Sequence, residues 1–358
     1  MGRCDSGNVN ATRSNPTPYG RGEARACGSM SSQVTSNGIL PLPAMGCGTW
    51  AWGNRLVWNY DERLDPQLQA AFETCVRGGA TLFDSGDSYG IGRRNGRSER
   101  LLGQFWQAYR GPNRDRICLA TKLAAYPWRL TRRALLRAGG ASAARLGHKL
   151  DLVQLHWSPA QYAPWQEGPL LRGLADCYQH GMAAAVGLSN YGPRGLQRAH
   201  RKLAECGAPV ATLQIQYSLL SNGPMAAEVR ELCGERGIRV IAYSPLALGL
   251  LTGKYREAGP LLVGLRRPLF RRLLPGIRPL LQALAAIAAE RQASQAQVAL
   301  NWCLCQGTIP IPGAKSAQQA RENLGALGWS LSAGEIAELE RAAQRCERRM
   351  VQNAFQTR

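Results

Sequence analysis

The chain alternates short apolar runs with longer amphipathic segments from about residue 38 onward. Each apolar run is hydrophobic through most of its length, which is typical of strands covered on both faces of a parallel sheet. The segments between them predict helices, because several end in glycine, the residue favoured just after a helix C-terminus. The predicted strands are residues 43–50, 80–85, 117–123, 150–157, 183–190, 211–218, 238–246 and 307–314. The predicted helices include residues 66–79, 170–181 and 225–237.

Eight parallel strands with intervening helices are the number that closes a (β/α)8 barrel. The pattern therefore predicts an α/β fold in which residues 38–358 form a single TIM barrel. A doubly wound open sheet is the alternative architecture. In a barrel the catalytic groups lie at the carboxyl ends of the strands, so polar residues at these positions are candidates for function.

Residues 1–37 have a different composition from the rest of the chain. They are rich in Ser, Thr, Asn, Gly and Arg, and poor in acids and large aliphatic residues. Such a segment buries too little apolar surface to fold alone, so we expect a disordered N-terminal extension. The same composition is typical of an organelle transit peptide, and a plain disordered tail is the alternative.

The formal charge of +20 raises the question of a nucleic-acid partner. The basic residues are mostly arginines spread along the chain, so we interpret them as solvated helix faces and expect no nucleic-acid binding. A denser basic group leaves a polyanion site as the alternative. Its members are Arg266, Arg267, Arg271, Arg272 and Arg278.

Membrane and metal partners are not expected either. No apolar run approaches the roughly 18 residues of a membrane span. The 11 cysteines include no C-x-x-C pair and the four histidines form no H-x-H or H-E-x-x-H motif. We therefore predict no metal site and a reducing compartment.

Three successive predicted strands end in a polar residue: Asp84, Lys122 and His156. Tyr89 follows Asp84 by five residues in the next loop. Burying a charge after an apolar run is costly unless it is paired, so we expect Asp84 to pair with Lys122. Taken singly, Asp84 could instead cap a helix, Lys122 could extend to solvent and His156 could be a core residue.

Together these four residues suit the protonation of a carbonyl oxygen. A tyrosine has an ordinary pKa of about 10, and a neighbouring ammonium is expected to lower it. A neutral imidazole can donate a hydrogen bond to a substrate carbonyl, and the tyrosine can then act as the acid while a hydride reaches the carbon. Such a site needs a hydride donor, which implies a nicotinamide cofactor.

This constellation resembles the aldo-keto reductases, (β/α)8 enzymes that reduce aldehydes and ketones with NADPH. The resemblance covers roughly residues 39–358 and implies a catalytic tetrad of Asp84, Tyr89, Lys122 and His156, with Tyr89 as the acid. It also implies a set of cofactor-binding residues along the strand ends. These are Gly48, Thr49, Trp50, Ser189, Asn190, Gln216, Tyr243, Ser244, Leu246, Lys315, Ser316, Gln319, Glu322 and Asn323.

One position departs from the family pattern. Many members carry an arginine for the 2′-phosphate of NADPH where this chain has Gln319. Lys315, with Arg321 as a further candidate, would then recognise that charge, and NADPH is preferred over NADH as the expected cofactor. In the family the long segment after residue 246 folds over the pyrophosphate. The basic candidates there are Lys254, Arg266, Arg267, Arg271 and Arg272.

Stretches such as GTWAWGN, DSYGIGRRNGRSERLLG and the terminal QNAFQTR resemble a subgroup of the family from plant plastids. That resemblance implies reduction of pyridoxal to pyridoxine, a small-molecule aldehyde as partner, and a location in the plastid stroma, with the cytoplasm as the alternative. Two further functions stay open: an NADPH-sensing auxiliary subunit, or a general aldehyde and ketone reductase with another substrate. Six aromatic residues near the predicted barrel mouth could stack on a flat substrate or simply pack the loops. They are Trp50, Trp52, Trp58, Tyr126, Trp128 and Trp157.

Overall fold

The structure is a computed structural model that describes residues 1–2, 40–90, 95–255 and 266–357. The predicted N-terminal extension and its boundary with the barrel fall almost entirely within residues 3–39, outside the described residues.

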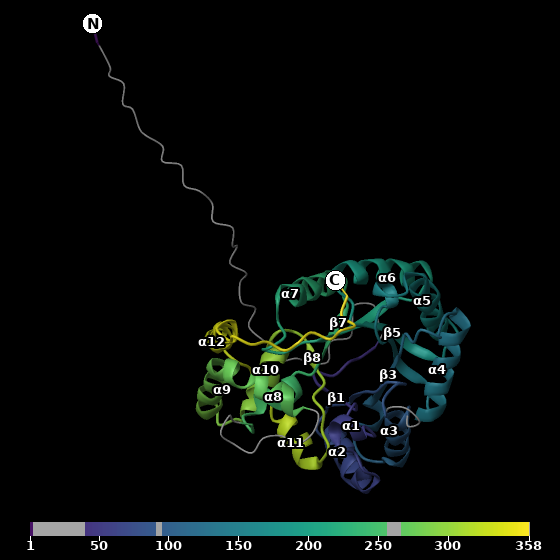
Figure 1. The fold of residues 1–358 in the computed structure, drawn as a ribbon, viewed down its shortest axis with the longest axis horizontal. Coiled ribbons are helices and arrows are strands. Elements are labelled where there is room, and N and C mark those ends of the chain that lie inside the picture. The colour runs from purple at the N-terminus through teal and green to yellow at the C-terminus, as the bar shows by residue number, and fades with distance from the viewer. Residues whose placement is uncertain (3–39, 91–94, 256–265, 358) are drawn as a thin grey trace.

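Eight parallel strands form one sheet in which each strand pairs with its neighbours in chain order (Figure 1). Gly48 forms a parallel bridge with Gly313, and its amide donates to the carbonyl of Pro312, so the first strand also meets the segment after the last. This contact brings the sheet round to a nearly closed barrel, which confirms the predicted architecture and shows that the open-sheet alternative is wrong. The strands are β1 (Gly46–Gly48), β2 (Leu82–Asp84), β3 (Cys118–Leu123), β4 (Leu150–Leu155), β5 (Ala183–Ser189), β6 (Val210–Gln216), β7 (Arg239–Tyr243) and β8 (Ile309–Pro310).

Helices surround the barrel, and the three helices named from the sequence appear as α2, α5 and α7. Several begin with a proline in the first turn, where its missing amide hydrogen costs nothing, and α10 and α12 begin with capping boxes. The helices that follow strands are α2 (Asp65–Arg77), α3 (Arg97–Ala108), α4 (Arg132–Leu146), α5 (Pro164–Gln179), α6 (Pro193–Glu205), α7 (Pro224–Glu235), α9 (Arg278–Glu290), α10 (Gln295–Cys305), α11 (Ala317–Leu324) and α12 (Ala333–Gln344). Two shorter helices lie in loops: α1 (Arg55–Trp58) and α8 (Arg267–Leu273).

The interior of the barrel has an apolar layer below a polar one. Leu82, Leu152 and Ile241 belong to a buried apolar cluster to which several strands contribute. Two residues further along β2 and β4 stand Asp84 and Gln154, which are also buried. Because side chains alternate across a strand with period two, each such pair faces the same side. The strands therefore present polar groups at their carboxyl ends, above an apolar floor.

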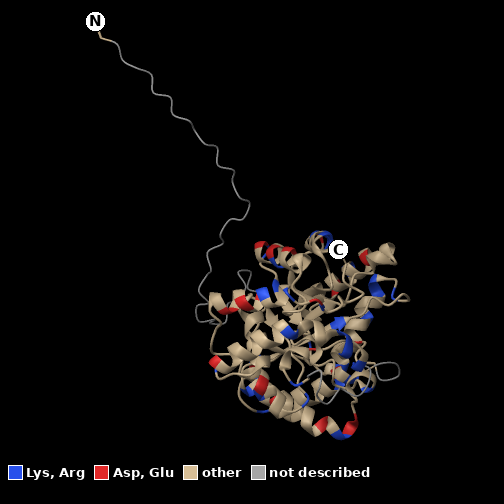
Figure 2. Ribbon diagram, turned by 60° about the vertical axis from the view of Figure 1, so that its left-hand side comes forward, with Lys and Arg blue, Asp and Glu red and all other residues tan. Residues whose placement is uncertain are grey.

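Lys and Arg residues are spread over many of the helices, with Asp and Glu residues among them (Figure 2). Several of these charges are paired between neighbouring elements, as in Arg145 with Glu99 and Arg291 with Glu335. Within the described part of the chain, no single helix has the length and apolarity to cross a membrane. The bent pair Arg267–Leu273 and Pro275–Glu290 meets that measure only when its two helices are taken together.

The C-terminal segment after α12 crosses the barrel and ends near β5 and β7 (Figure 1, yellow). The amide of Met350 donates to Leu220 O at 3.2 Å, and the amide of Thr357 donates to Asn190 O at 3.1 Å. We call residues 350–357 the C-terminal strap. It reaches the same end of the barrel as the polar strand ends.

Candidate active site

A buried ion pair between Lys122 and Asp84 lies at the centre of the polar layer. The two side chains are 1% and 2% exposed. The second carboxylate oxygen of Asp84 accepts hydrogen bonds from Gln154 Nε2 at 2.9 Å and Gln214 Nε2 at 2.8 Å. The pairing expected from the sequence is therefore present, and neither the helix-cap alternative for Asp84 nor the solvent-facing alternative for Lys122 holds.

The ammonium group of Lys122 stays charged despite its burial. Burial lowers the pKa of this lysine, but the opposing effect of Asp84, with a smaller one from Tyr89, leaves the pKa raised above its ordinary value. A fixed positive charge in a low-dielectric site acts strongly on its neighbours. The neighbour of interest is the phenol of Tyr89.

Tyr89 and His156 lie beside this charge. Lys122 Nζ is 5.0 Å from the centroid of the Tyr89 ring, and the rings of Tyr89 and His156 are 5.8 Å apart at an angle of 73°. Burial and then Lys122 hold the pKa of His156 well below its ordinary value, so its imidazole is neutral near pH 7. The structure thus brings the four predicted catalytic side chains into one cluster.

Lys122 lowers the pKa of Tyr89 as expected, but the net pKa of this tyrosine is raised. Burial raises the pKa of Tyr89 above its ordinary value of 10.0, and this effect exceeds the opposing effect of Lys122. Desolvation penalises the phenolate more than one ammonium can compensate. Tyr89 is consequently protonated near neutrality, which is the state that a proton donor needs.

Hydroxyl groups below the tetrad fix the end of β2. The amide of Thr49 donates to Asp84 O at 2.9 Å, and Thr49 Oγ1 lies 2.7 Å from Ser98 Oγ. Ser98 Oγ in turn donates to Thr49 O at 3.0 Å and receives a bond from Ser85 Oγ at 3.0 Å. This network joins β1, β2 and the start of α3, so it holds the backbone from which Asp84 projects.

The predicted nicotinamide-binding residues on β5, β6 and β7 also form a connected group. Asn190 Nδ2 donates to His156 O at 3.1 Å and to Ser189 Oγ at 3.2 Å, while Asn190 Oδ1 accepts from the Tyr243 hydroxyl at 2.8 Å. Asn190 has a φ of +60°, a conformation that asparagine tolerates better than most residues. Gln216 Nε2 donates to Ser221 Oγ at 2.9 Å and to Val351 O at 3.1 Å, so its amide oxygen is the group left for a ligand.

The C-terminal strap binds to this group and was not identified as a site from the sequence. Asn353 Nδ2 donates to the Tyr243 hydroxyl at 2.9 Å, and Thr357 Oγ1 accepts from the amide of Gly192 at 3.0 Å. The Phe355 ring stacks on Trp157 with centroids 4.3 Å apart. No periodicity predicts such a strap, because its partners are separated from it by more than 100 residues of sequence.

The residues predicted to bind the adenosine end lie in α11 and in the two positions before it. Ser316 caps this helix by accepting the amide of Gln319 at 3.3 Å, and Gln319 Oε1 accepts the amide of Lys315 at 2.8 Å. Asn323 is buried and donates to Gly313 O at 3.4 Å, whereas Glu322 is exposed. Gln319 therefore supports the local backbone rather than supplying the positive charge that the family's arginine provides.

The remaining predicted cofactor positions lie at the ends of β1 and β7. Gly48 ends β1, and Trp50 in the following turn is 37% exposed. Ser244 follows β7 with a φ of +51°, and Leu246 packs partly buried against the main core. These positions belong to the same carboxyl-terminal end of the sheet as the tetrad.

The six aromatic residues do not all lie at the mouth. Trp52 is fully buried and its indole donates to Ala314 O at 2.9 Å, so it is a core residue and the interpretation of it as a substrate platform is wrong. Tyr126 and Trp128 stack with centroids 4.6 Å apart, and Trp128 is 73% exposed. The rings of Trp157 and His156 have centroids 4.9 Å apart, so the aromatic residues extend to the tetrad.

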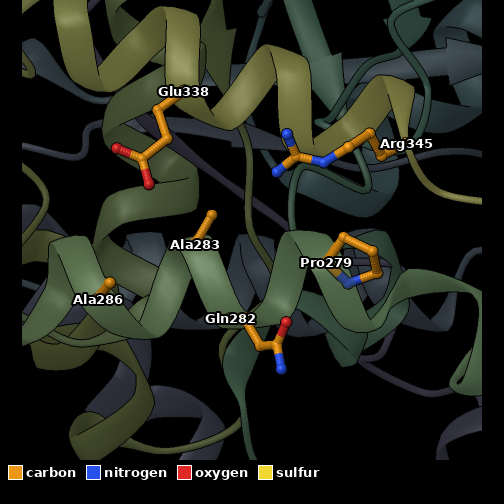
Figure 3. Close-up of a pocket in the computed structure, with 6 residues that line it drawn as sticks. All are labelled: Pro279, Gln282, Ala283, Ala286, Glu338 and Arg345. Carbon is orange, nitrogen blue, oxygen red and sulfur yellow. The ribbon is translucent and has the colours of Figure 1, made fainter.

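A surface hollow between α9 and α12 lies outside this site (Figure 3). Glu338 and Arg345 line it on one side, and Pro279, Gln282, Ala283 and Ala286 on the other. It contains none of the tetrad or predicted cofactor residues. Among the described residues, no group of three or more His, Cys, Asp or Glu side chains could hold a metal ion.

The eight-stranded barrel carries a buried ionisable cluster at its strand ends, and the proteins that it is similar to are oxidoreductases. A family model described as "Aldo/keto reductase family" matches residues 44–344, and the chain belongs to this family. It is 50% identical over 329 residues to a protein of Arabidopsis thaliana named "Pyridoxal reductase, chloroplastic", covering 91% of this chain and 90% of the relative. It is 30% identical over 348 residues to "L-glyceraldehyde 3-phosphate reductase" of Escherichia coli, covering 91% and 94%.

Solved structures agree with this assignment. An aldo-keto reductase from Klebsiella pneumoniae in complex with NADPH is 27% identical and superposes with a TM-score of 0.65, covering 87% of this chain and 95% of that one. The similarity extends through the whole barrel, so the expected family membership is confirmed.

The protonation states of the tetrad predict a level pH profile. His156 is neutral because its pKa lies well below 6.5, and Tyr89 is protonated because its pKa lies above 10.0. We expect kcat/KM for reduction of a non-ionising aromatic aldehyde to stay level between about pH 7 and about pH 9, because neither group changes charge there. Initial rates at saturating cofactor measure this, and a fall toward pH 9 would contradict the raised tyrosine pKa.

Proposed function

We propose that the protein reduces pyridoxal to pyridoxine with NADPH, with Tyr89 as the general acid. The observation that carries the proposal is the buried Asp84–Lys122 pair beside a protonated Tyr89 and a neutral His156. The substrate is suggested by the relative from Arabidopsis thaliana, whose name is that of a pyridoxal reductase and whose similarity covers both chains almost fully.

The residues at the barrel mouth fit a nicotinamide cofactor. Gln216 offers its amide oxygen, and Tyr243, whose hydroxyl donates to Asn190, offers an aromatic ring at the end of β7. Lys315 and Arg266 add positive charge near the start of α11, where the phosphates of the adenosine half would bind. NADPH, when bound, supplies the hydride for the carbonyl carbon.

The chain's own residues supply the proton and the charge. The neutral imidazole of His156 donates a hydrogen bond that orients the substrate carbonyl, and the Tyr89 hydroxyl transfers its proton to that oxygen. Lys122 stabilises the phenolate that forms, because its charge lies beside the ring in a buried site. Asp84, fixed by Gln154 and Gln214, keeps the ammonium in place.

The aromatic surface beside His156 suits a flat heteroaromatic aldehyde. Trp157 and Phe355 form one stacked pair, and Tyr126 and Trp128 form another. Tyr126 and Trp157 meet nearly perpendicular, at 84° and 6.3 Å, so the two pairs adjoin. Planar rings gain from offset and edge contacts with other aromatic rings.

Purified full-length protein should oxidise NADPH when it is given pyridoxal. We expect kcat/KM for pyridoxal to exceed that for benzaldehyde by at least about tenfold, which corresponds to roughly one additional good contact in the transition state. The decrease in NADPH absorbance measures both rates. Equal values would contradict pyridoxal as the preferred substrate, and tight NADPH binding without turnover of any aldehyde would favour the sensing subunit.

We propose that the protein works in the plastid stroma. The composition of residues 1–37 and the chloroplastic relative support this location. A fusion of residues 1–40 to a fluorescent protein should be imported into chloroplasts of leaf cells, because Arg-rich, acid-poor segments act as transit peptides. Uniform cytosolic fluorescence of this fusion would contradict the stromal location and favour the cytoplasm.

A further inference from the structure

Trp58 holds two cationic side chains against its ring. The guanidinium carbon of Arg266 lies 4.2 Å from the ring centroid, and Lys315 Nζ lies 5.9 Å from it. Trp58 ends α1, Arg266 directly precedes α8, and Lys315 directly precedes the cap of α11. Three segments far apart in the sequence therefore meet at one indole. The ring contacts two cations, so it is a binding surface for positive charge and not a platform for an aromatic substrate.

The gathered charges are electrostatically unfavourable without a ligand. Burial, followed by Arg266 and Lys254, lowers the pKa of Lys315, and burial also lowers the pKa of Arg266. Within residues 40–90, 95–255 and 266–357, no carboxylate forms an ion pair with Lys254, Arg266 or Lys315. The face of an indole attracts cations and compensates part of this repulsion. An anion that accepts from both side chains would compensate the rest.

The position of Lys315 identifies which anion fits. Its amide is fixed by Gln319, and the next residue caps α11, where the adenosine half of the cofactor is proposed to bind. A phosphate monoester there carries up to two negative charges and needs several donors. NADH has an uncharged hydroxyl at the corresponding place, which leaves two partly buried cations without a counter-ion.

We infer that Trp58 is a positioning residue for the 2′-phosphate of NADPH, because its ring holds Arg266 and Lys315 together as a two-cation clamp. This inference rests on the proposed use of NADPH. It also explains how the chain compensates for Gln319 at the position of the family's arginine: the second cation comes from Arg266, which reaches the site across the indole. Trp58 thereby discriminates between NADPH and NADH without touching the reacting atoms.

The orientation of the clamp is fixed by its surroundings. Trp50 packs edge-on against Trp58, with ring centroids 5.7 Å apart and an angle of 84° between the planes, so this contact fixes the orientation of the Trp58 indole. Asn54 caps α1 by accepting the amide of Val57 at 3.0 Å. Arg266 also donates to Leu248 O at 3.1 Å, which ties the clamp to the turn after β7. The cations are therefore held in place before the cofactor arrives.

Replacing Trp58 with Leu tests the clamp by cofactor binding alone. Calorimetric titration of the full chain should show a dissociation constant for NADPH raised about tenfold and one for NADH that is unchanged, because only the phosphate contact is loosened. Trp58→Phe keeps a smaller π face, so its dissociation constant for NADPH should lie between those of Trp58→Leu and wild type. This variant replaces Trp58→Leu in the test if the Leu variant is unstable. Trp106→Leu is the matched control, because Trp106, on α3, also has a cation over its ring: the guanidinium carbon of Arg114 lies 4.7 Å from the ring centroid. This variant should leave the affinity for both cofactors unchanged.

Each of the following results would overturn the inference. An unchanged affinity for NADPH in both Trp58 variants, or an equal loss for NADPH and NADH, would show that Trp58 does not act through the 2′-phosphate. An equal loss in Trp106→Leu would show a general effect of removing a tryptophan. A wild-type chain with no preference for NADPH over NADH contradicts the proposed cofactor itself, whereas a preference that is undiminished in Trp58→Leu contradicts the role of Trp58 alone.

Discussion

The buried pair of Asp84 and Lys122 is the interaction on which the rest of the site depends. Two charges that are almost wholly removed from water are tolerated only when each is paired and hydrogen-bonded. The chain meets that condition with Gln154 and Gln214 on the carboxylate, while the Thr49–Ser98 hydroxyl network holds the backbone at the end of β2. The result is a fixed positive charge beside a phenol that burial keeps protonated.

The barrel makes this arrangement possible because it separates stability from chemistry. Its apolar interior layer and the helices around it supply the core, while the strand ends carry groups that would be costly elsewhere. The C-terminal strap then joins both halves of the mouth. Asn353 contacts Tyr243 on the proposed cofactor side, and Phe355 contacts Trp157 on the proposed substrate side.

The strands and the tetrad could be predicted from the sequence because both leave local signals. The apolar runs that end in Asp84, Lys122 and His156 can be recognised from the local sequence without knowledge of distant contacts. Gln154 follows the period-two pattern, two residues beyond the inward-facing Leu152, whereas Gln214 lies two residues beyond the polar Thr212. Their shared partner, Asp84, appears only in three dimensions. The roles of Trp52 and Trp58 could not be predicted, because an aromatic residue in a loop gives the same pattern whether it faces core, cation or substrate. The raised pKa of Tyr89 depends likewise on burial, which spacing does not report.

Single-turnover hydride transfer in Tyr89→Phe tests whether Tyr89 donates the proton. With NADPH bound and pyridoxal in excess, we expect the rate of NADPH oxidation to fall by about 100- to 10,000-fold, because the proton donor is gone, while the affinity for NADPH is kept. Tyr109→Phe should keep the wild-type rate. It removes a hydroxyl that donates to Pro112 O at 2.8 Å and takes no part in the tetrad. A Tyr89→Phe rate close to wild type would contradict the role of Tyr89 as the proton donor beside the buried ion pair.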